Sequence, residues 1–351
     1  MTAPASGRVS DVLASIEGAI RALWKPDAAG RARARAATLN LVCVTGVEQQ
    51  AEFVQVADEV STRLLARTFL IVVDPRAEPW GLEGTVSAVS SGGSAGGAVT
   101  AERIELRLGA AASKRAQSVV EALLAPRLPV ALLVGPGAHA SVVDQLAPHA
   151  GRVVLDSAQC GVARAAAVAE LTPGRIEDLA FVRGRRWREM LARFFDDPSL
   201  VPALGAVRRL AIEHAATPER PASAEADLVL GWLGARLGWR VEGGALVASD
   251  GARPTIQRRP VARDDLVPGW LASIEIEAEL PAGQVVGRAA RDESSEVITW
   301  SLAAPWGALG PRRFLVPRRE PAELAARAVS DPFGDTLARE ALTLAAAWSR
   351  S

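Results

Sequence analysis

The residues whose spacing best fits a chemical site are two glycines and an aspartate in the first half of the chain. A strand-like run, VALLV at 130–134, is followed by a G-x-G-x-x-A arrangement that begins at Gly135 and Gly137. Asp156 ends the next strand-like run. In a dinucleotide site such glycines let the pyrophosphate approach a helix N-terminus, and the carboxylate binds a ribose hydroxyl. Gly135, Gly137 and Asp156 are therefore candidate nucleotide-binding residues.

A tight strand–helix turn in an α/β domain explains the same residues without a ligand. The helix expected after the glycines spans only about 141–147 and stops at Pro148. The unit also comes late in the predicted sheet instead of opening it. We favour this structural interpretation, predict no cofactor, and retain nucleotide or phosphosugar binding by the 135–156 unit as the alternative.

Two other patterns that could indicate chemistry have simpler explanations. Gly92-Gly93-Ser94-Ala95-Gly96 satisfies G-x-S-x-G, but a nucleophile elbow needs a strand before the serine and a helix directly after it. The next regular element here is strand-like, so we predict a hairpin tip. The three histidines, His139, His149 and His214, lack paired metal-ligand spacing, and no metal site is expected.

The two cysteines are too few for a disulfide framework of the secreted kind. Cys43 lies in the strand-like run LNLVCVT and is expected to be a small core residue. Cys160 opens an alanine-rich, helix-like run, where a helix N-terminus lowers a thiol pKa.

The segment from Asp178 to Trp239 is dense in Trp and Arg, the residue types that dominate protein–protein hot spots. Its first predicted helix places Trp187 and Phe194 on one apolar face, ringed by arginines. A second helix is predicted between an N-cap at Ser223 and a C-cap at Gly238. The apolar face is most simply domain core, although an Arg-rich rim could meet an acidic partner. The candidate interface residues are Arg186, Trp187, Trp232 and Trp239.

A second arginine-rich run, RRFLVPRR at 312–319, allows the same two interpretations. It could present a similar rim to a partner, or it could be an edge strand protected by its charges.

Composition argues against several classes of function. Forty basic side chains balance forty acidic ones, so no global field attracts nucleic acid or an acidic membrane. All but two of the basic residues are arginine, which fits GC-rich coding and is not evidence of phosphate recognition. We find neither a signal peptide nor an apolar run of membrane-spanning length, and we expect a cytoplasmic bacterial-type protein.

The spacing of apolar residues predicts two domains after an N-terminal helix and basic connector at 1–37. Residues 38–175 alternate strands and helices, which is typical of a mostly parallel sheet, with a hairpin formed by 84–90 and 103–108. Residues 176–351 contain short strands at roughly ten-residue spacing and helices at about 321–329 and 335–348. We therefore predict an α/β domain followed by an α+β domain whose antiparallel sheet is covered by helices.

The order of these segments resembles that of the OpcA family, which comprises glucose-6-phosphate dehydrogenase assembly or subunit proteins. In the first half the resemblance is carried by LNLVCVTG, RTFLIVVDP, RIELRLGA, LPVALLVGPG and RVVLDSA. In the second half it is carried by DLAFVRGRRWREMLARFFDD, GWLGARLGW, GPRRFLVPRREPAELAARAV and DTLAREAL. It covers roughly residues 38 to 345 and is that of a divergent member.

The resemblance implies a non-catalytic protein that binds glucose-6-phosphate dehydrogenase and promotes its assembly or activation. Such a partner would act as an allosteric activator and support NADPH production by the oxidative pentose phosphate pathway. The alternative is a nucleotide- or phosphosugar-binding protein or enzyme that uses the 135–156 unit.

Overall fold

A computed structural model describes residues 5–7, 9–25, 37–90, 100–293, 296–331 and 336–349. The described residues form two compact units. Unit 1 falls within Met1–Cys160, Ala167–Glu177 and Glu320–Gly334, and unit 2 falls within Gly161–Ala166, Asp178–Arg319 and Asp335–Ser351. None of the described helices has the length and apolar character needed to cross a membrane.

Unit 1 is built on an eight-stranded sheet whose spatial order is β1-β4-β5-β3-β2-β6-β7-β8. Strands β5, β3, β2, β6 and β7 run parallel, while β1 and β4 extend the sheet antiparallel. The segment from β5 to β8 follows the order of a doubly wound dinucleotide-binding sheet. The strands are β1 (Ala5–Gly7), β2 (Leu39–Thr45), β3 (Ala66–Val73), β4 (Leu82–Ser90), β5 (Thr100–Leu108), β6 (Val130–Val134), β7 (Arg152–Leu155) and β8 (Arg175–Asp178).

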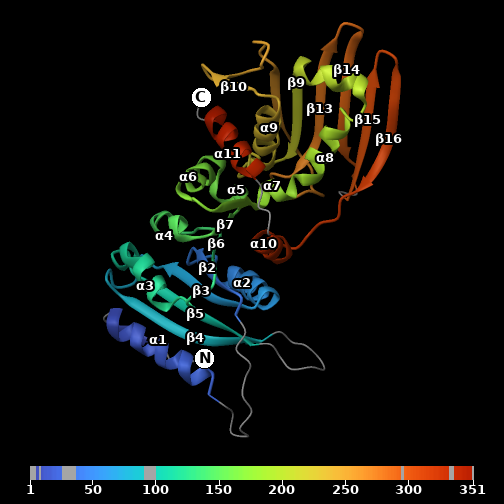
Figure 1. The fold of residues 1–351 in the computed structure, drawn as a ribbon. Coiled ribbons are helices and arrows are strands. Elements are labelled where there is room, and N and C mark those ends of the chain that lie inside the picture. The colour runs from blue at the N-terminus through green and yellow to red at the C-terminus, as the bar shows by residue number, and fades with distance from the viewer. Residues whose placement is uncertain are drawn as a thin grey trace, which may run out of the picture. The chain divides into compact units, whose positions relative to one another are not determined.

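The central strands are continuous apolar runs because helices cover the sheet, as parallel sheets require. Every residue of β3 is buried, as is β2 beyond Leu39. Helix α2 packs on β2 and β3 and lies beside α10, and α1 packs on β4 (Figure 1). The helices of unit 1 are α1 (Val9–Leu23), α2 (Gln50–Leu64), α3 (Ala116–Leu123), α4 (Ala140–Leu146), α5 (Ser157–Cys160) and α10 (Pro321–Ser330), with short 3₁₀ turns η1 (Ala112–Arg115) and η2 (Ala147–His149). Helix α6 (Val162–Leu171) is divided between the two units.

Unit 2 is built on a six-stranded sheet in the order β12-β9-β13-β14-β15-β16. All neighbours are antiparallel except β12 and β9. Figure 1 shows α8 and α9 across one face of this sheet. The strands are β9 (Val207–Ala215), β12 (Thr255–Val261), β13 (Leu271–Leu280), β14 (Gly283–Arg291), β15 (Val297–Ala304) and β16 (Gly307–Leu315), with β10 (Arg240–Glu242) and β11 (Ala245–Val247) forming a separate ribbon.

The helices of unit 2 begin and end where local chemistry favours it. Helix α9 begins at Ser223, whose Oγ accepts a hydrogen bond from Ala226 N at 3.1 Å, and it ends before Gly238, where φ is +68°. The predicted Ser223 N-cap is thus confirmed, whereas the C-cap residue is Leu237 and Gly238 follows it. The helices are α7 (Leu179–Arg183), α8 (Arg185–Arg193), α9 (Ala224–Arg236) and α11 (Thr336–Ser349), with the 3₁₀ segment η3 (Pro198–Ala206).

The predicted fold class is confirmed: a mostly parallel mixed sheet with helices, then a mostly antiparallel sheet with helices. Three details differ from the sequence prediction. The long helix expected after Asp178 is broken at Gly184 into α7 and α8. Strand β12 pairs parallel with β9. Helix α10 packs on α2 and β7 in unit 1, whereas the sequence placed it with the second domain.

The close packing of α9 on α11 gives a test of the fold. A Cβ at Gly231 would lie 2.2 Å from Ala341 O, so Gly231→Ala must push the helices apart and should lower the free energy of unfolding by about 1–3 kcal/mol. Gly18 in α1 has open space, so Gly18→Ala should raise it by about 0.5–1 kcal/mol. Urea titrations followed by circular dichroism check both, and equal effects would contradict this packing.

Candidate functional site

The aromatic face of α8 is buried in the core of unit 2. Trp187 is 1% exposed, and Met190, Leu191 and Phe194 are equally buried. Arg291 lies with its guanidinium carbon 5.6 Å from the centre of the Trp187 ring. The Trp187 indole N–H has no hydrogen-bond partner among the described residues, so this side chain contributes packing. This burial confirms the simpler of the two predictions, that the apolar face is part of the domain core.

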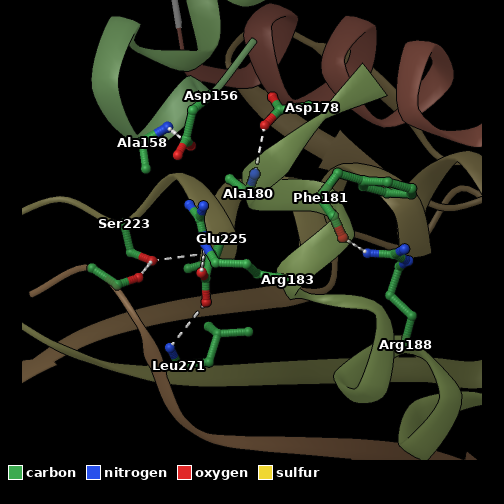
Figure 2. A network of polar contacts seen from close by, with 12 residues as sticks. Asp156, Ala158, Asp178, Ala180, Phe181, Arg183, Arg188, Ser223, Glu225 and Leu271 are labelled. Carbon is green, nitrogen blue, oxygen red and sulfur yellow. Dashed lines mark hydrogen bonds and ion pairs between the residues drawn. The ribbon is translucent and has the colours of Figure 1, made fainter. Parts of the chain in front are cut away.

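The five arginines around α8 have different environments. Arg183 is paired with Glu225 at 2.9 Å, and Arg188 is buried with its guanidinium 3.4 Å from the Phe181 ring centre. Figure 2 shows the Arg183–Glu225 pair and the hydrogen bond that Arg188 donates to the Phe181 carbonyl oxygen. Arg185 and Arg186 both pair with Glu189. Partial burial acts to raise the pKa of the Glu189 carboxyl, but the hydrogen bonds from the two arginines outweigh it and lower that pKa. Arg193 forms no ion pair or hydrogen bond with any residue in the described ranges.

Of the four predicted interface residues, Arg186 is the most exposed. Its side chain is 54% exposed, whereas Trp187 and Trp239 are buried and Trp232 is half-buried against the core. The structure therefore places these four residues in one unit but does not bring their side chains together on its surface. Their contact with a partner stays a prediction.

Two tryptophans that the sequence analysis did not select are exposed. Trp80 is 59% exposed and Trp306 is 52% exposed, and each stands in a Pro-Trp-Gly triplet within a turn. The turn that carries Trp80 is held by hydrogen bonds from Ala111 N and Ala112 N to Pro79 O, and Arg115 lies 5.5 Å from the indole centre. Proline and glycine favour turns, so the two triplets were the signal in the sequence for tryptophans outside the core.

The candidate nucleotide residues lie where the topology predicts a ligand crevice. Gly135 and Gly137 follow β6, and Gly46 follows β2, at the point where the strand order reverses. The two turns are joined directly, since Gly46 N donates to Pro136 O at 2.9 Å and Gly135 N donates to Val44 O at 2.8 Å. These contacts hold the turns together at the strand ends.

Both glycines of the pattern have close neighbours within the fold. A Cβ at Gly135 would lie 2.6 Å from the Phe53 ring, and one at Gly137 would lie 2.5 Å from Gln49 Oε1. Gly137 also has φ +66°, which favours glycine. The structure thus gives each glycine a packing reason, which supports the tight-turn interpretation.

The acidic groups at the neighbouring strand ends are also engaged within unit 1. Asp156 follows β7 and accepts a hydrogen bond from Ala158 N at 3.0 Å. Asp74 follows β3, the second strand of the doubly wound order, where a ribose-binding carboxylate is expected. A hydrogen bond from Arg76 N and a 2.7 Å ion pair with Arg107 lower the pKa of the Asp74 carboxyl. Nucleotide binding at these strand ends stays a prediction.

The remaining candidate groups are scattered. His149 is half-exposed and lies 3.6 Å from Glu121, and His139 precedes α4. Cys43 is fully buried in β2, where burial raises the pKa of its thiol, whereas Cys160 is half-buried. Within the described ranges no three His, Cys, Asp or Glu side chains are placed to share a metal ion. The Gly92–Gly96 pattern lies outside the described residues.

A carboxylate at the start of α9, that of Asp227, is buried. Burial raises the pKa of Asp227, although an ion pair with Arg258 and the nearby His214 oppose the shift. Arg258 also lies 4.4 Å from the Trp348 ring centre. His214 Nε2 lies 3.0 Å from Pro221 O, and its Nδ1 is unpartnered among the described residues. This cluster joins β9, β12, α9 and α11.

Comparison with known proteins assigns both halves of the chain. The fold defines a protein of two units, one with a mostly parallel mixed sheet and one with a mostly antiparallel sheet. Residues 57–172 match the glucose-6-phosphate dehydrogenase subunit N-terminal domain, and residues 175–342 match the corresponding C-terminal domain. The chain belongs to the OpcA family of glucose-6-phosphate dehydrogenase subunit proteins.

The chain is also similar to individual proteins, at lower coverage or lower identity. A Synechocystis sp. (strain ATCC 27184 / PCC 6803 / Kazusa) protein described as OxPP cycle protein OpcA is 30% identical over 147 residues, which cover 40% of this chain and 30% of the relative. An oxidoreductase domain protein from Kribbella flavida is 12% identical with a TM-score of 0.40, covering 90% and 91% of the two chains. An oxidoreductase from Sinorhizobium meliloti is 13% identical with a TM-score of 0.42, covering 89% and 97%.

The contrast between buried and exposed tryptophans can be measured. Trp187→Ala removes a fully buried side chain and should lower the free energy of unfolding by about 3–5 kcal/mol. Trp306→Ala, at an exposed turn, should change it by less than about 0.5 kcal/mol. Urea unfolding followed by far-ultraviolet circular dichroism distinguishes them. A Trp187 variant as stable as the Trp306 variant would be incompatible with the packing of α8.

The raised pKa of Asp227 predicts a specific pH dependence. An acid whose pKa is raised by folding stabilises the protein in its protonated form, and this stability is lost as pH rises from the unfolded value of about 3.9 through the folded pKa. Asp227→Asn should flatten that part of the profile. In the exposed Asp250 the hydrogen bond from Ala252 N lowers the pKa, so Asp250→Asn should instead flatten the loss on acidification. Urea unfolding titrations at a series of pH values measure these effects. If both variants kept the wild-type dependence of unfolding free energy on pH, the pKa shifts assigned to Asp227 and Asp250 would be refuted.

Proposed function

We propose that this protein binds glucose-6-phosphate dehydrogenase in the cytoplasm, without catalysing a reaction itself, and promotes the assembly or active state of that enzyme. The observation that carries the proposal is the match of successive segments, 57–172 and 175–342, to the N- and C-terminal domains of one dehydrogenase subunit family. The consequence would be control of NADPH supply through the oxidative pentose phosphate pathway.

The physical mechanism we propose is a population shift. A partner that binds the active oligomer of the dehydrogenase better than its inactive form raises the active fraction by the ratio of the two affinities. A tenfold activation requires about 1.4 kcal/mol of differential binding. A few aromatic and arginine contacts supply that amount, and the exposed Trp80 and Trp306 are available for them.

The alternative function, binding of a nucleotide or phosphosugar at 135–156, makes a different prediction. A ligand at a hundred times its dissociation constant would stabilise the protein by about 2.7 kcal/mol. The packing of Phe53 and Gln49 against Gly135 and Gly137 favours the proposed partner role over this alternative. Thermal unfolding with NADP, NAD, ATP and glucose 6-phosphate would support the alternative if any of them raised the midpoint.

The direct test measures dehydrogenase activity and oligomer size with increasing amounts of this protein, using the dehydrogenase of the same organism. We expect a saturable rise in activity and a co-migrating complex in size-exclusion chromatography, because binding shifts the dehydrogenase towards its active form. Asp156→Asn should activate like the wild type, since its carboxylate lies at the strand ends of unit 1. Gly135→Ala is a poorer control because its methyl group would collide with Phe53.

Absence of both complex and activation, under reducing and under oxidising conditions, would refute the proposed function. Activation that is lost in Asp156→Asn, with folding intact, would instead indicate the strand-end site.

A further inference from the structure

Unit 2 contains a cleft beside its last strand. The cleft has a volume of about 250 Å³ and lies between the end of α8, the segment η3 and strands β15 and β16. Its apolar lining includes Phe194, Leu200, Trp300, Leu309 and Phe314. Cross-strand pairing places Leu309 opposite Leu302 and Phe314 opposite Ile298, so the cleft residues of β16 share the core-side face of the sheet.

The floor of this cleft is held rigidly. The rings of Phe194 and Trp300 stack with centres 5.2 Å apart and planes at 16°. Trp300 Nε1 donates to Met190 O at 3.2 Å. Behind Phe194 a Cβ at Gly287 would lie 2.7 Å from the ring, so Phe194 cannot retreat into the sheet. A preformed apolar floor binds a side chain without the cost of ordering its own residues.

Two guanidinium groups at the cleft form no ion pair with any residue that the structure describes. Arg193 lies 5.2 Å from the Phe314 ring centre, and Arg312 lies 5.9 Å from that of Trp300. Both side chains belong to exposed residues, and neither donates a hydrogen bond to any residue in the described ranges. Stacking on an aromatic ring leaves the in-plane N–H donors of arginine available to a carboxylate.

The acidic residues of the cleft form no ion pair with these guanidiniums in the part of the chain that the structure describes. Asp197 Oδ1 accepts hydrogen bonds from Ser199 N at 2.9 Å and Ser199 Oγ at 2.7 Å, so its carboxylate caps η3. Asp196 is exposed and forms no ion pair within the described ranges. The next arginine along β16, Arg313, is by contrast paired with Asp292 at 2.7 Å.

The outer side of β16 is open for an additional strand. In the sheet order β16 is the last strand, and no strand of the described residues pairs with its outer edge. Leu309 and Leu315 are 47% and 65% exposed along it. An exposed strand edge beside pockets for alternate side chains is the arrangement that binds extended peptides.

We propose that this cleft is the docking site for an extended acidic segment of the dehydrogenase that lies along β16. The segment inserts one large apolar side chain against Phe194 and Trp300. A carboxylate two residues away, on the same face of the added strand, pairs with Arg193 or Arg312. This assignment rests on the proposed function, because it names the surface through which the dehydrogenase is bound.

The test compares charge reversals at the cleft with a charge reversal on the opposite face of β16. Full-length Arg193→Glu/Arg312→Glu and Arg313→Glu proteins are titrated against purified dehydrogenase from the same organism, with affinity and activation as readouts. The double variant should weaken binding at least about tenfold, since the carboxylate then meets two like charges. Arg313→Glu, on the opposite face, should bind within about threefold of wild type. Leu309→Asp, at an exposed position, should reproduce the loss without charge reversal of an arginine.

Circular dichroism spectra and thermal midpoints verify that the variants are folded. If the double variant and Leu309→Asp both bind the dehydrogenase as tightly as the wild type does, this assignment is overturned and the proposed function stands. Equal losses in the double variant and in Arg313→Glu would also overturn it, because they would indicate a general charge effect. If the wild-type protein itself does not bind the dehydrogenase, the proposed function fails first.

Discussion

The packing of α8 against the sheet of unit 2 is the interaction on which the rest of that unit depends. Phe194 fits against Gly287, where any side chain would collide with its ring, and stacks on Trp300. This face takes Trp187 and Phe194 into the core. Arg185, Arg186 and Arg193 of the same helix remain exposed, whereas Arg188 is buried. The rigidity of the cleft beside β16, and the availability of Arg193 there, both follow from it.

Much of the fold follows from local pattern. Continuous apolar runs such as 39–45 and 66–73 are readable as parallel strands, and Ser223 and Gly238 mark the ends of α9 because capping is a local property. Non-local pairing is not readable in this way. The amphipathic pattern of 321–330 predicts a helix but not that it packs on α2, whose residues precede it by more than two hundred positions. The parallel pairing of β12 with β9 likewise joins segments that are far apart in the sequence.

The candidate site shows where composition misleads. Buried cores and protein interfaces share the same aromatic residues, so the sequence could not decide whether Trp187 faces a partner or the interior. The Pro-Trp-Gly triplets, which the sequence analysis did not use, place the exposed Trp80 and Trp306 in turns. The glycine pattern did locate the strand ends correctly. Its nucleotide interpretation competes with the contacts that Phe53 and Gln49 make with the same glycines.

Hydrogen–deuterium exchange of this protein with and without glucose-6-phosphate dehydrogenase tests the central claim most directly, because it maps the bound surface without a substitution. The account predicts slower amide exchange in two segments of unit 2, residues 193–201 and 297–315, since an added strand would satisfy the open edge of β16. A stable complex whose protection is confined to unit 1, for example at 135–156, would contradict it.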